Sequence, residues 1–146
     1  MKNLLLFVLV ILTGCTSTNT YKAEPSLNES NSATIYFYRT GVAYNSLNPE
    51  KPFFYLDNKL VAKLGTGSSI KIFVTPGEHA LTSKESFMFL PNSESGRVLG
   101  LFEAGRTYYV RYSKEFSHFS SFGVGFVMSD TSSLKLATKQ QFIDKS

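Results

Sequence analysis

The stretch "ATIYFYR", residues 33–39, decides the fold class of this chain. In an extended backbone Ala33, Ile35 and Phe37 fall on one side, and the residues between them fall on the other. Alternation with a period of two is typical of a β-strand that buries one face. We therefore predict a strand over these residues, and stretches on the C-terminal side repeat the pattern.

Two of these stretches alternate around turn residues. The first, "PFFYLDNKLVAKL" at 52–64, predicts two short strands around Asp57-Asn58-Lys59, because Asp and Asn tolerate the left-handed conformations of tight hairpin turns. The second, "SIKIFVTPGEHALTS" at 69–83, predicts a strand, a turn at Pro76-Gly77 and a second strand. We interpret it as a further hairpin.

The last part of the chain contains three more candidate elements. "RVLGLFEAGRTYYVRY" at 97–112 predicts two strands separated by a turn. "FGVGFVM" at 122–128 predicts one strand whose large apolar residues share a face. "SDTSSLKLATKQQFID" at 129–144 fits a short helix with Asp130 or Ser132 as N-cap, or one more strand with a frayed tail, and we favour the helix.

Short strands with no long helical run between them predict a mainly β protein. We expect a small antiparallel β-sandwich with a short C-terminal helix over residues 33–146. A parallel βαβ architecture is disfavoured because the crossover helices that it needs are missing. The 146 residues are 42% hydrophobic and 14% aromatic, which suits one domain with a core of its own.

Residues 1–14 have the organisation of an export signal. A basic start at Lys2 precedes the apolar run Leu4–Leu12, and two small residues then lead to Cys15. A membrane-spanning helix needs about 20 apolar residues, so this run is too short to hold the protein in a membrane. We predict a signal peptide that is cleaved after residue 14.

The tetrapeptide Leu12-Thr13-Gly14-Cys15 resembles the lipobox of bacterial lipoproteins. The resemblance implies that the peptide is cut before Cys15 and that this residue carries acyl chains such as palmitate, which would anchor the protein to a lipid bilayer of the cell envelope. By the same resemblance, Thr16 in place of an aspartate implies the outer membrane, facing the periplasm. The alternatives are an ordinary cleaved signal followed by a chance cysteine, and a buried core thiol.

Residues 15–32 are rich in Ser, Thr and Asn and contain few apolar groups. We predict a lipidated N-terminus followed by a flexible linker that lets the domain float off the membrane. The alternative is that this segment adds an edge strand to the domain.

Four of the quoted elements, taken in order behind the lipobox, resemble a family of small bacterial lipoproteins known only as a domain of unknown function. They are "ATIYFYR", "YLDNKLVAKL", "VTPGEHAL" and "EAGRTYYVRY". The hairpin is also similar to β modules named after a Pro-Glu-Gly-Ala motif, with Asp57-Asn58 where that family usually has Asp-Gly. The resemblance covers residues 33–112, apart from 83–97. It implies a β domain in the envelope and brings no activity with it.

The sequence shows no catalytic or metal-binding pattern. His79 and His118 are the only histidines, and zinc needs three or four suitably spaced ligands, so we predict no metal, no cofactor and no enzymatic activity. His79 lies just after the Pro-Gly turn, where a structural role is the simpler interpretation. The alternative is a small envelope hydrolase or ligand carrier that uses His79 with Glu78 or a nearby serine. The net charge of +4 comes from scattered residues, which argues against a nucleic-acid partner.

The candidate binding face is aromatic. If Ile35 and its period-two neighbours face the core, the opposite face carries Tyr36, Tyr38, Tyr109 and Arg111. Tyrosine and arginine are enriched in binding hot spots, so we predict a non-enzymatic module that binds an envelope protein or glycan here. Alternatively, the chain's own C-terminal segment covers this face, or the aromatic pairs only stabilise the sheet.

Overall fold

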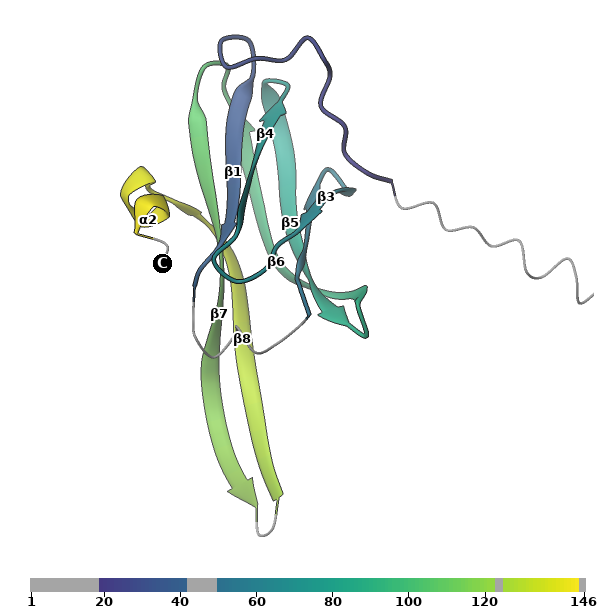
Figure 1. The fold of residues 1–146 in the computed structure, drawn as a ribbon, viewed down its shortest axis with the longest axis vertical. Helices are drawn as coiled ribbons and strands as arrows, with labels where there is room; N and C mark the ends of the chain where they lie inside the picture. Colours follow the sequence, from purple (N-terminus) through teal and green to yellow (C-terminus); the bar gives the residue numbers. More distant parts are fainter. Residues whose placement is uncertain (1–18, 42–49, 123–124, 145–146) are drawn as a thin grey trace, which may run out of the picture.

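The computed structural model describes residues 19–41, 50–122 and 125–144, with the side chains of 116–130 outside the description. Within these ranges two four-stranded sheets pack face to face (Figure 1). The β1 sheet has the order β4 (Ser69–Val74), β1 (Ala33–Arg39), β7 (Thr107–Phe122), β8 (Gly125–Ala137). The β2 sheet has the order β3 (Lys59–Lys63), β2 (Phe53–Leu56), β5 (Gly77–Phe87), β6 (Leu90–Phe102). Helix α2 (Lys139–Ile143) follows β8. The mainly β, sandwich-like fold with a short C-terminal helix is confirmed.

One strand pair is parallel within sheets that are otherwise antiparallel, as the predicted sandwich requires. β1 and β7 run in the same direction, with Ile35 opposite Tyr108 and Phe37 opposite Val110. The other pairs between described strands are antiparallel. A parallel pair needs a long connection, and here the chain builds the whole β2 sheet before it returns as β7.

The expected hairpin over residues 69–83 is wrong. β4 belongs to the β1 sheet and β5 to the β2 sheet, so Pro76-Gly77 carries the chain across the sandwich. A period of two identifies the buried face of a strand but not the sheet that the strand joins. Val74 and Leu81 reach the same core from opposite sheets, and the sequence pattern alone cannot distinguish this from a hairpin.

Two hairpin turns contain residues in the left-handed region. Asp57 and Asn58, with φ of 46° and 64°, connect β2 to β3 as predicted. Met88 and Phe89, with φ of 49° and 63°, connect β5 to β6. The second turn lies in residues 83–97, where the sequence offers no familiar turn pair.

A long hairpin of β7 and β8 replaces the single strand predicted over 122–128. Phe122 pairs with Gly125, so the chain reverses direction at this point. Residues 115–122 and 125–131, which we call the ribbon, pair only with each other among the described strands. In Figure 1 the ribbon extends well beyond the rest of the sandwich.

The C-terminal helix begins later than predicted. Thr138 is its N-cap, because the Thr138 hydroxyl accepts a hydrogen bond from the Gln141 amide while the Gln141 side chain accepts one from the Thr138 amide. Neither Asp130 nor Ser132 has this role. Both belong to β8, since the backbone there pairs with β7.

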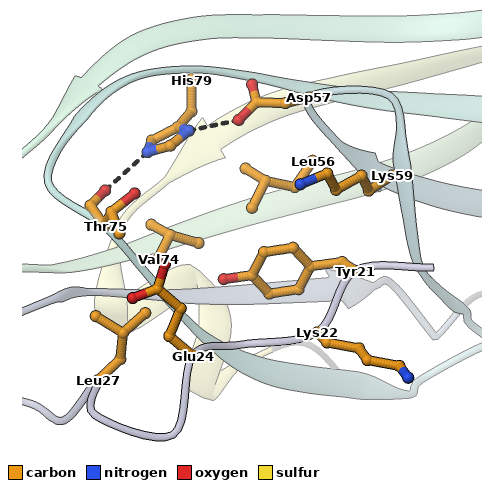
Figure 2. A pocket seen from close by; sticks show the side chains of 10 residues that line it. All are labelled: Tyr21, Lys22, Glu24, Leu27, Leu56, Asp57, Lys59, Val74, Thr75 and His79. Carbon is orange, nitrogen blue, oxygen red and sulfur yellow. Dashed lines mark hydrogen bonds and ion pairs between the residues drawn. The ribbon is translucent and has the colours of Figure 1, made fainter. Parts of the chain in front are cut away.

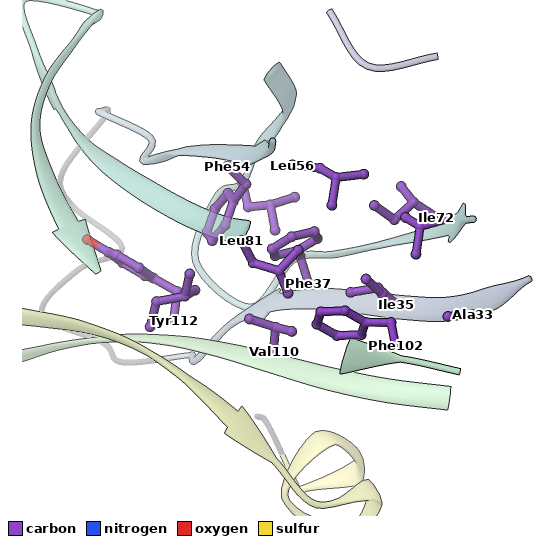
Figure 3. Close-up of a cluster of buried hydrophobic side chains, with 13 residues drawn as sticks. Ala33, Ile35, Phe37, Phe54, Leu56, Ile72, Leu81, Phe102, Val110 and Tyr112 are labelled. Atoms are coloured by element: carbon purple, nitrogen blue, oxygen red, sulfur yellow. The ribbon is translucent and has the colours of Figure 1, made fainter. Parts of the chain in front are cut away.

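The core lies between the sheets and combines aliphatic with aromatic side chains (Figure 3). Phe54 of the β2 sheet packs against Phe37 and Tyr112 of the β1 sheet, with ring centroids 5.5 and 5.6 Å apart. Ile35 and Val110 are fully buried beside them. The face of β1 and β7 that was predicted to point inward is therefore the one that does.

Residues 19–32 lie along the domain, where the sequence predicted a flexible linker. The Tyr21 amide donates to Leu60 of β3, and the Leu60 amide donates to Asn19, both at 2.8 Å. The Tyr21 hydroxyl also donates to the Phe73 carbonyl, and its ring packs against the core. This half-buried tyrosine attaches a segment whose polar composition resembles that of a linker. Within the described ranges, no helix has the length and apolar character needed to cross a membrane.

Candidate functional site

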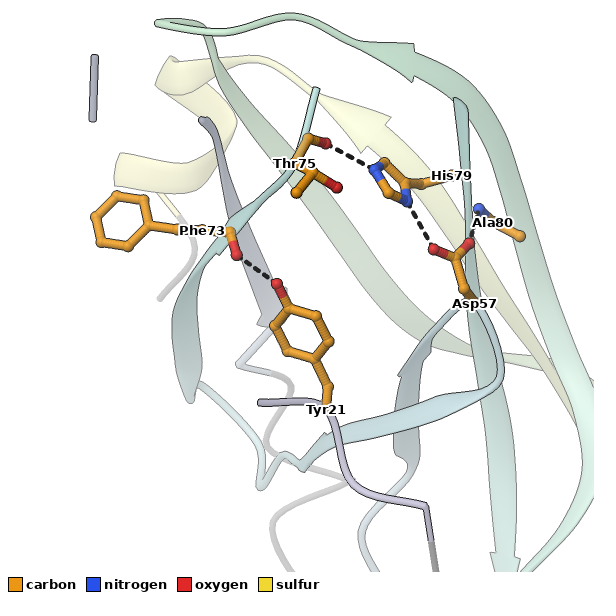
Figure 4. A network of polar contacts seen from close by, with 6 residues as sticks. All are labelled: Tyr21, Asp57, Phe73, Thr75, His79 and Ala80. Carbon is orange, nitrogen blue, oxygen red and sulfur yellow. Dashed lines mark hydrogen bonds and ion pairs between the residues drawn. The ribbon is translucent and has the colours of Figure 1, made fainter. Parts of the chain in front are cut away.

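A polar network around His79 joins two connections of the fold (Figure 4). Nδ1 of His79 lies 2.6 Å from Oδ2 of Asp57, which belongs to the β2–β3 turn. Nε2 of His79 lies 2.7 Å from the carbonyl oxygen of Thr75, which belongs to the crossover from β4 to β5. Oδ1 of Asp57 accepts a hydrogen bond from the Ala80 amide at 2.9 Å. The imidazole therefore ties the turn to the crossover.

The donors and acceptors of this network leave His79 little freedom for chemistry. Both ring nitrogens face protein partners at hydrogen-bond distance, Nδ1 the Asp57 carboxylate and Nε2 the Thr75 carbonyl. A general base needs a nitrogen lone pair directed at the proton it removes. Neither nitrogen offers one in this arrangement, and Glu78, the partner suggested by the sequence, makes no hydrogen bond to the ring.

Asp57 is the more exposed member of the pair. Its side chain is 45% exposed, and that of His79 is 12% exposed. Burial opposes ionisation of Asp57, but the hydrogen bonds from Ala80 and His79, together with the nearby charge of Lys59, outweigh it and lower the pKa of the carboxyl. The network is thus built around an ionised Asp57.

A cavity of about 150 Å³ lies beside this network (Figure 2). Tyr21, Glu24 and Leu27 of the docked N-terminal segment line one side of it, opposite His79 and Thr75. Sites for small organic ligands usually enclose about 300–1,000 Å³. This cavity is smaller than that range, but a second and more open recess of about 510 Å³, lined by His79, Glu78 and Leu101, falls within it. Cavity size alone therefore does not argue against a ligand carrier that uses His79.

A second polar cluster is partly buried between the sheets. The Tyr112 hydroxyl donates to Oε1 of Glu85 at 2.7 Å, and Nζ of Lys114 lies 3.4 Å from Oε2. Burial opposes the charge of Glu85, but hydrogen bonds from Ser132, Tyr112 and Lys114 lower its pKa. Burial and the Glu85 carboxylate raise the pKa of Tyr112 well above its ordinary value. This cluster orients β5 against β7, and its buried groups have partners within the protein.

The four residues of the predicted binding face come together, but they do not form an open surface. The rings of Tyr36 and Tyr109 stack with centroids 5.4 Å apart. Phe142 of α2 packs on Tyr36, Tyr38 and Tyr109 at 5.1, 5.3 and 5.0 Å. Tyr38 is fully buried, and Arg111 is half-buried. The C-terminal segment therefore covers this face, which is the alternative that the sequence left open.

No match to this chain is found among models of protein families, curated proteins or solved structures. The evidence for the candidate site is therefore its geometry alone. Cys15 and the side chain of His118 lie outside the described residues. Among the described residues, no group of three or more His, Cys, Asp or Glu side chains is placed to hold a metal ion.

The surface that the sequence analysis missed is the β5–β6 hairpin tip, residues 87–90. Its four side chains are large, apolar and 63–72% exposed. The run "FMFL" in the printed sequence could have indicated it, because a continuous apolar run that is no part of a longer alternating pattern needs an explanation. Its exposure follows from the turn at Met88 and Phe89, which no turn-forming residue pair marks in the sequence.

Proposed function

We propose that this protein is a bacterial envelope lipoprotein, held at the periplasmic face of the outer membrane by acyl chains on Cys15, and that its sandwich binds a protein partner without catalysis. The observation that carries the proposal is Leu12-Thr13-Gly14-Cys15 at the end of an apolar run too short to span a bilayer. Several acyl chains together make such an anchor effectively permanent. The resemblance to small envelope lipoproteins supports the same location.

The path of the N-terminal segment supports a close attachment. Among the described residues, contacts with the domain are present from Asn19 onward. Asn19 is four positions after Cys15, and such a segment spans at most about 14 Å when fully extended. Acyl chains on Cys15 would therefore keep the sandwich beside the bilayer surface, because no long linker separates the two.

The ribbon supports the binding role. A two-stranded hairpin is marginally stable on its own in water, yet this one extends beyond the sandwich with no third strand among those described. The exposed backbone groups of such edges are where another chain can add a strand. We assign partner binding to the ribbon.

Mass spectrometry of the N-terminal peptide tests the anchor. We expect a mature chain that begins at acylated Cys15 and needs detergent to leave the membrane. Cys15→Ser should abolish both properties, whereas Thr16→Ser, the matched control, should keep them. An unacylated wild-type protein that is released without detergent would contradict the proposal.

Crosslinking in intact envelopes tests the partner. Replacing residues 116–130 by Asn-Gly joins Glu115 to Thr131, which already pair with each other, through a favourable hairpin turn. We expect this shortened protein to stay folded and to lose its crosslinked partner. The control is Tyr36→Ala with Tyr109→Ala, which should keep the partner because Phe142 covers both rings. The reverse result would assign binding to the tyrosines.

A further inference from the structure

The tip of the β5–β6 hairpin exposes more apolar surface than a soluble turn requires. Phe87, Met88, Phe89 and Leu90 are 63, 72, 64 and 68% exposed. Isolated apolar residues on a surface are ordinary, but four consecutive large ones form a patch, and such patches mark sites that contact a membrane or another protein.

The backbone of this turn makes its apolar side chains more unusual. Met88 and Phe89 both have positive φ, 49° and 63°. This conformation is strained for residues with a large side chain, and Asn or Gly would relieve the strain. The β2–β3 turn of the same protein uses Asp57 and Asn58 at equivalent angles. The turn therefore contains strained and exposed apolar residues at positions where polar residues would make the fold more stable. Such a cost to stability points to a function of these side chains.

Positive charge lies directly beside the tip. Phe89 shares a recess of about 280 Å³ with Lys51 and Lys63. The Lys63 ammonium lies 4.4 Å from the Phe53 ring centroid, and the Lys84 ammonium lies 5.1 Å from that of Tyr55. Both lysines are thus held against the sheet near the base of the hairpin.

Two carboxylates near the tip are turned toward other groups. Glu94 forms a bidentate ion pair with Arg97, in which Nε and Nη2 of Arg97 lie 3.0 and 2.9 Å from the two carboxylate oxygens. The charge of Lys84 also stabilises the ionised form of Glu94. Glu85 is bound by Tyr112 and Lys114 on the side of the β1 sheet. Among the described residues that line the recess beside Phe89, the charged ones are therefore lysines.

We propose that the β5–β6 hairpin tip is a second membrane contact, whose apolar side chains enter the interfacial layer of an anionic phospholipid bilayer while Lys51 and Lys63 bind a lipid phosphate. An apolar tip with a basic rim is the combination that interfacial binding needs. We choose lipid over a protein partner because of this charge and because of the position of the tip. This inference rests on the proposed function, which brings the domain to a bilayer.

The placement of the tip agrees with the anchor. The chain enters the described structure at Asn19, beside Leu60, and β3 leads from there to Lys63, about 10 Å along the strand. In Figure 1 this entry point and the hairpin tip lie on the same side of the sandwich. A bilayer within about 14 Å of Asn19 is thus within reach of the tip.

Tryptophan fluorescence can test the contact, because the sequence contains no tryptophan. Phe89→Trp places a single probe in the tip of the full mature protein. On vesicles of phosphatidylglycerol and phosphatidylcholine we expect its emission to shift to the blue and to be quenched by lipids brominated on their acyl chains. Leu99→Trp, at a position that is 70% exposed on β6 and about 30 Å along the strand from Leu90, should show neither change.

Two variants separate the apolar and the charged contributions. Met88→Asn with Phe89→Gly gives the turn a favourable pair, so this protein should fold at least as well as the wild type. In the Cys15→Ser background it should lower partitioning onto the same vesicles about tenfold. Lys51→Gln with Lys63→Gln should weaken binding to anionic vesicles and leave the weaker binding to pure phosphatidylcholine unchanged.

The outcomes distinguish the tip from the anchor. If the Phe89→Trp protein is acylated at Cys15 but its tryptophan is not quenched, the proposed function stands and this inference is overturned. If the same protein carries no acyl chains and its tryptophan is quenched, this inference stands and the proposed anchor is overturned. A tip tryptophan that is protected only when a crosslinked protein partner is bound would assign the tip to that partner and reject the lipid contact.

Discussion

Nδ1 of His79 lies 2.6 Å from Oδ2 of Asp57, and this contact holds together two connections that belong to different parts of the chain. Asp57 lies in the turn between two strands of the β2 sheet, whereas the other ring nitrogen of His79 contacts Thr75, where the chain leaves the β1 sheet. A single imidazole therefore helps to fix how the chain passes from one sheet to the other.

The first prediction concerns the energy of this contact. His79→Ala and Asp57→Ala should each lower the free energy of unfolding by about 1–2 kcal/mol, because each leaves hydrogen-bonding partners unsatisfied. Since Asp57 is half exposed, the coupling between the two residues in a double-mutant cycle should be about 1 kcal/mol. Urea denaturation of the four proteins measures both quantities. Fully additive losses would show that the two side chains act independently.

The second prediction concerns pH. The folded state lowers the pKa of Asp57 from an ordinary value of 3.8, so the stability that its ionised form contributes is present above about pH 4. This contribution disappears as the pH falls through the lower, folded-state pKa. Asp57→Asn should therefore be less stable than the wild type at pH 7, and the difference should narrow below about pH 4. A difference that stays constant from neutral to strongly acidic pH would exclude this origin.

The sequence predicts which face of a strand is buried better than it predicts which strands pair with each other. The alternation of Ile35 and Phe37 correctly identifies the face of β1 that points into the core, because a period of two places successive apolar side chains on one face of a strand. The partner of a strand depends on contacts far away in the sequence. The sequence pattern predicts that the strand beginning at Gly77 forms a hairpin with β4, but this strand pairs with β2 and β6.

The candidate binding site was predicted only in part, for a related reason. The four residues from Tyr36 to Arg111 gather on one face because alternation in two neighbouring strands requires it. Their covering by Phe142 depends on where α2 folds back, and no local pattern encodes that. The sequence does not predict the hairpin tip, because Met88 and Phe89 are not among the residues that usually adopt the left-handed backbone conformation of such turns.

The third prediction tests the packing of α2. Phe142→Ala should lower the free energy of unfolding by about 1–2 kcal/mol, less than the loss of a fully buried phenylalanine, because Phe142 is only half-buried. The rings of Tyr36 and Tyr109 should become more accessible to nitration by tetranitromethane. Ile143→Ala is the control, since Ile143 is 59% exposed. Equal nitration of both variants would show that Phe142 does not shield the tyrosines.

The fourth prediction compares two glycines of β6. A Cβ atom at Gly96 would lie 2.6 Å from the backbone nitrogen of Leu134, whereas at Gly100 it would lie 3.5 Å from the ring of Phe102. Gly96→Ala should therefore cost about 1–3 kcal/mol, because backbone cannot yield as a side chain can. Gly100→Ala should be nearly neutral. Thermal unfolding of both proteins measures the contrast, and equal stability would mean that β6 and β8 are farther apart than described.

The last prediction concerns the buried hydrogen bond between Tyr112 and Glu85. Tyr112→Phe removes the hydroxyl that donates to Glu85 at 2.7 Å, and it should lower the free energy of unfolding by about 1–2 kcal/mol at pH 7. The pKa of Glu85 should rise, because one hydrogen bond to its ionised form is lost.

The pH dependence of stability shows whether the loss in Tyr112→Phe comes from that hydrogen bond to the ionised Glu85. The folded state lowers the pKa of Glu85 below 4.5, so the stability gained from its ionised form is complete above that value and is lost as the pH falls. The difference between wild type and Tyr112→Phe should therefore shrink below about pH 4. Tyr108→Phe is the matched control, because the Tyr108 hydroxyl accepts a hydrogen bond from the backbone amide of Glu103 and its loss should cost the same at every pH. A Tyr112→Phe deficit that does not change with pH would mean that the hydroxyl matters for packing and not for the charge of Glu85.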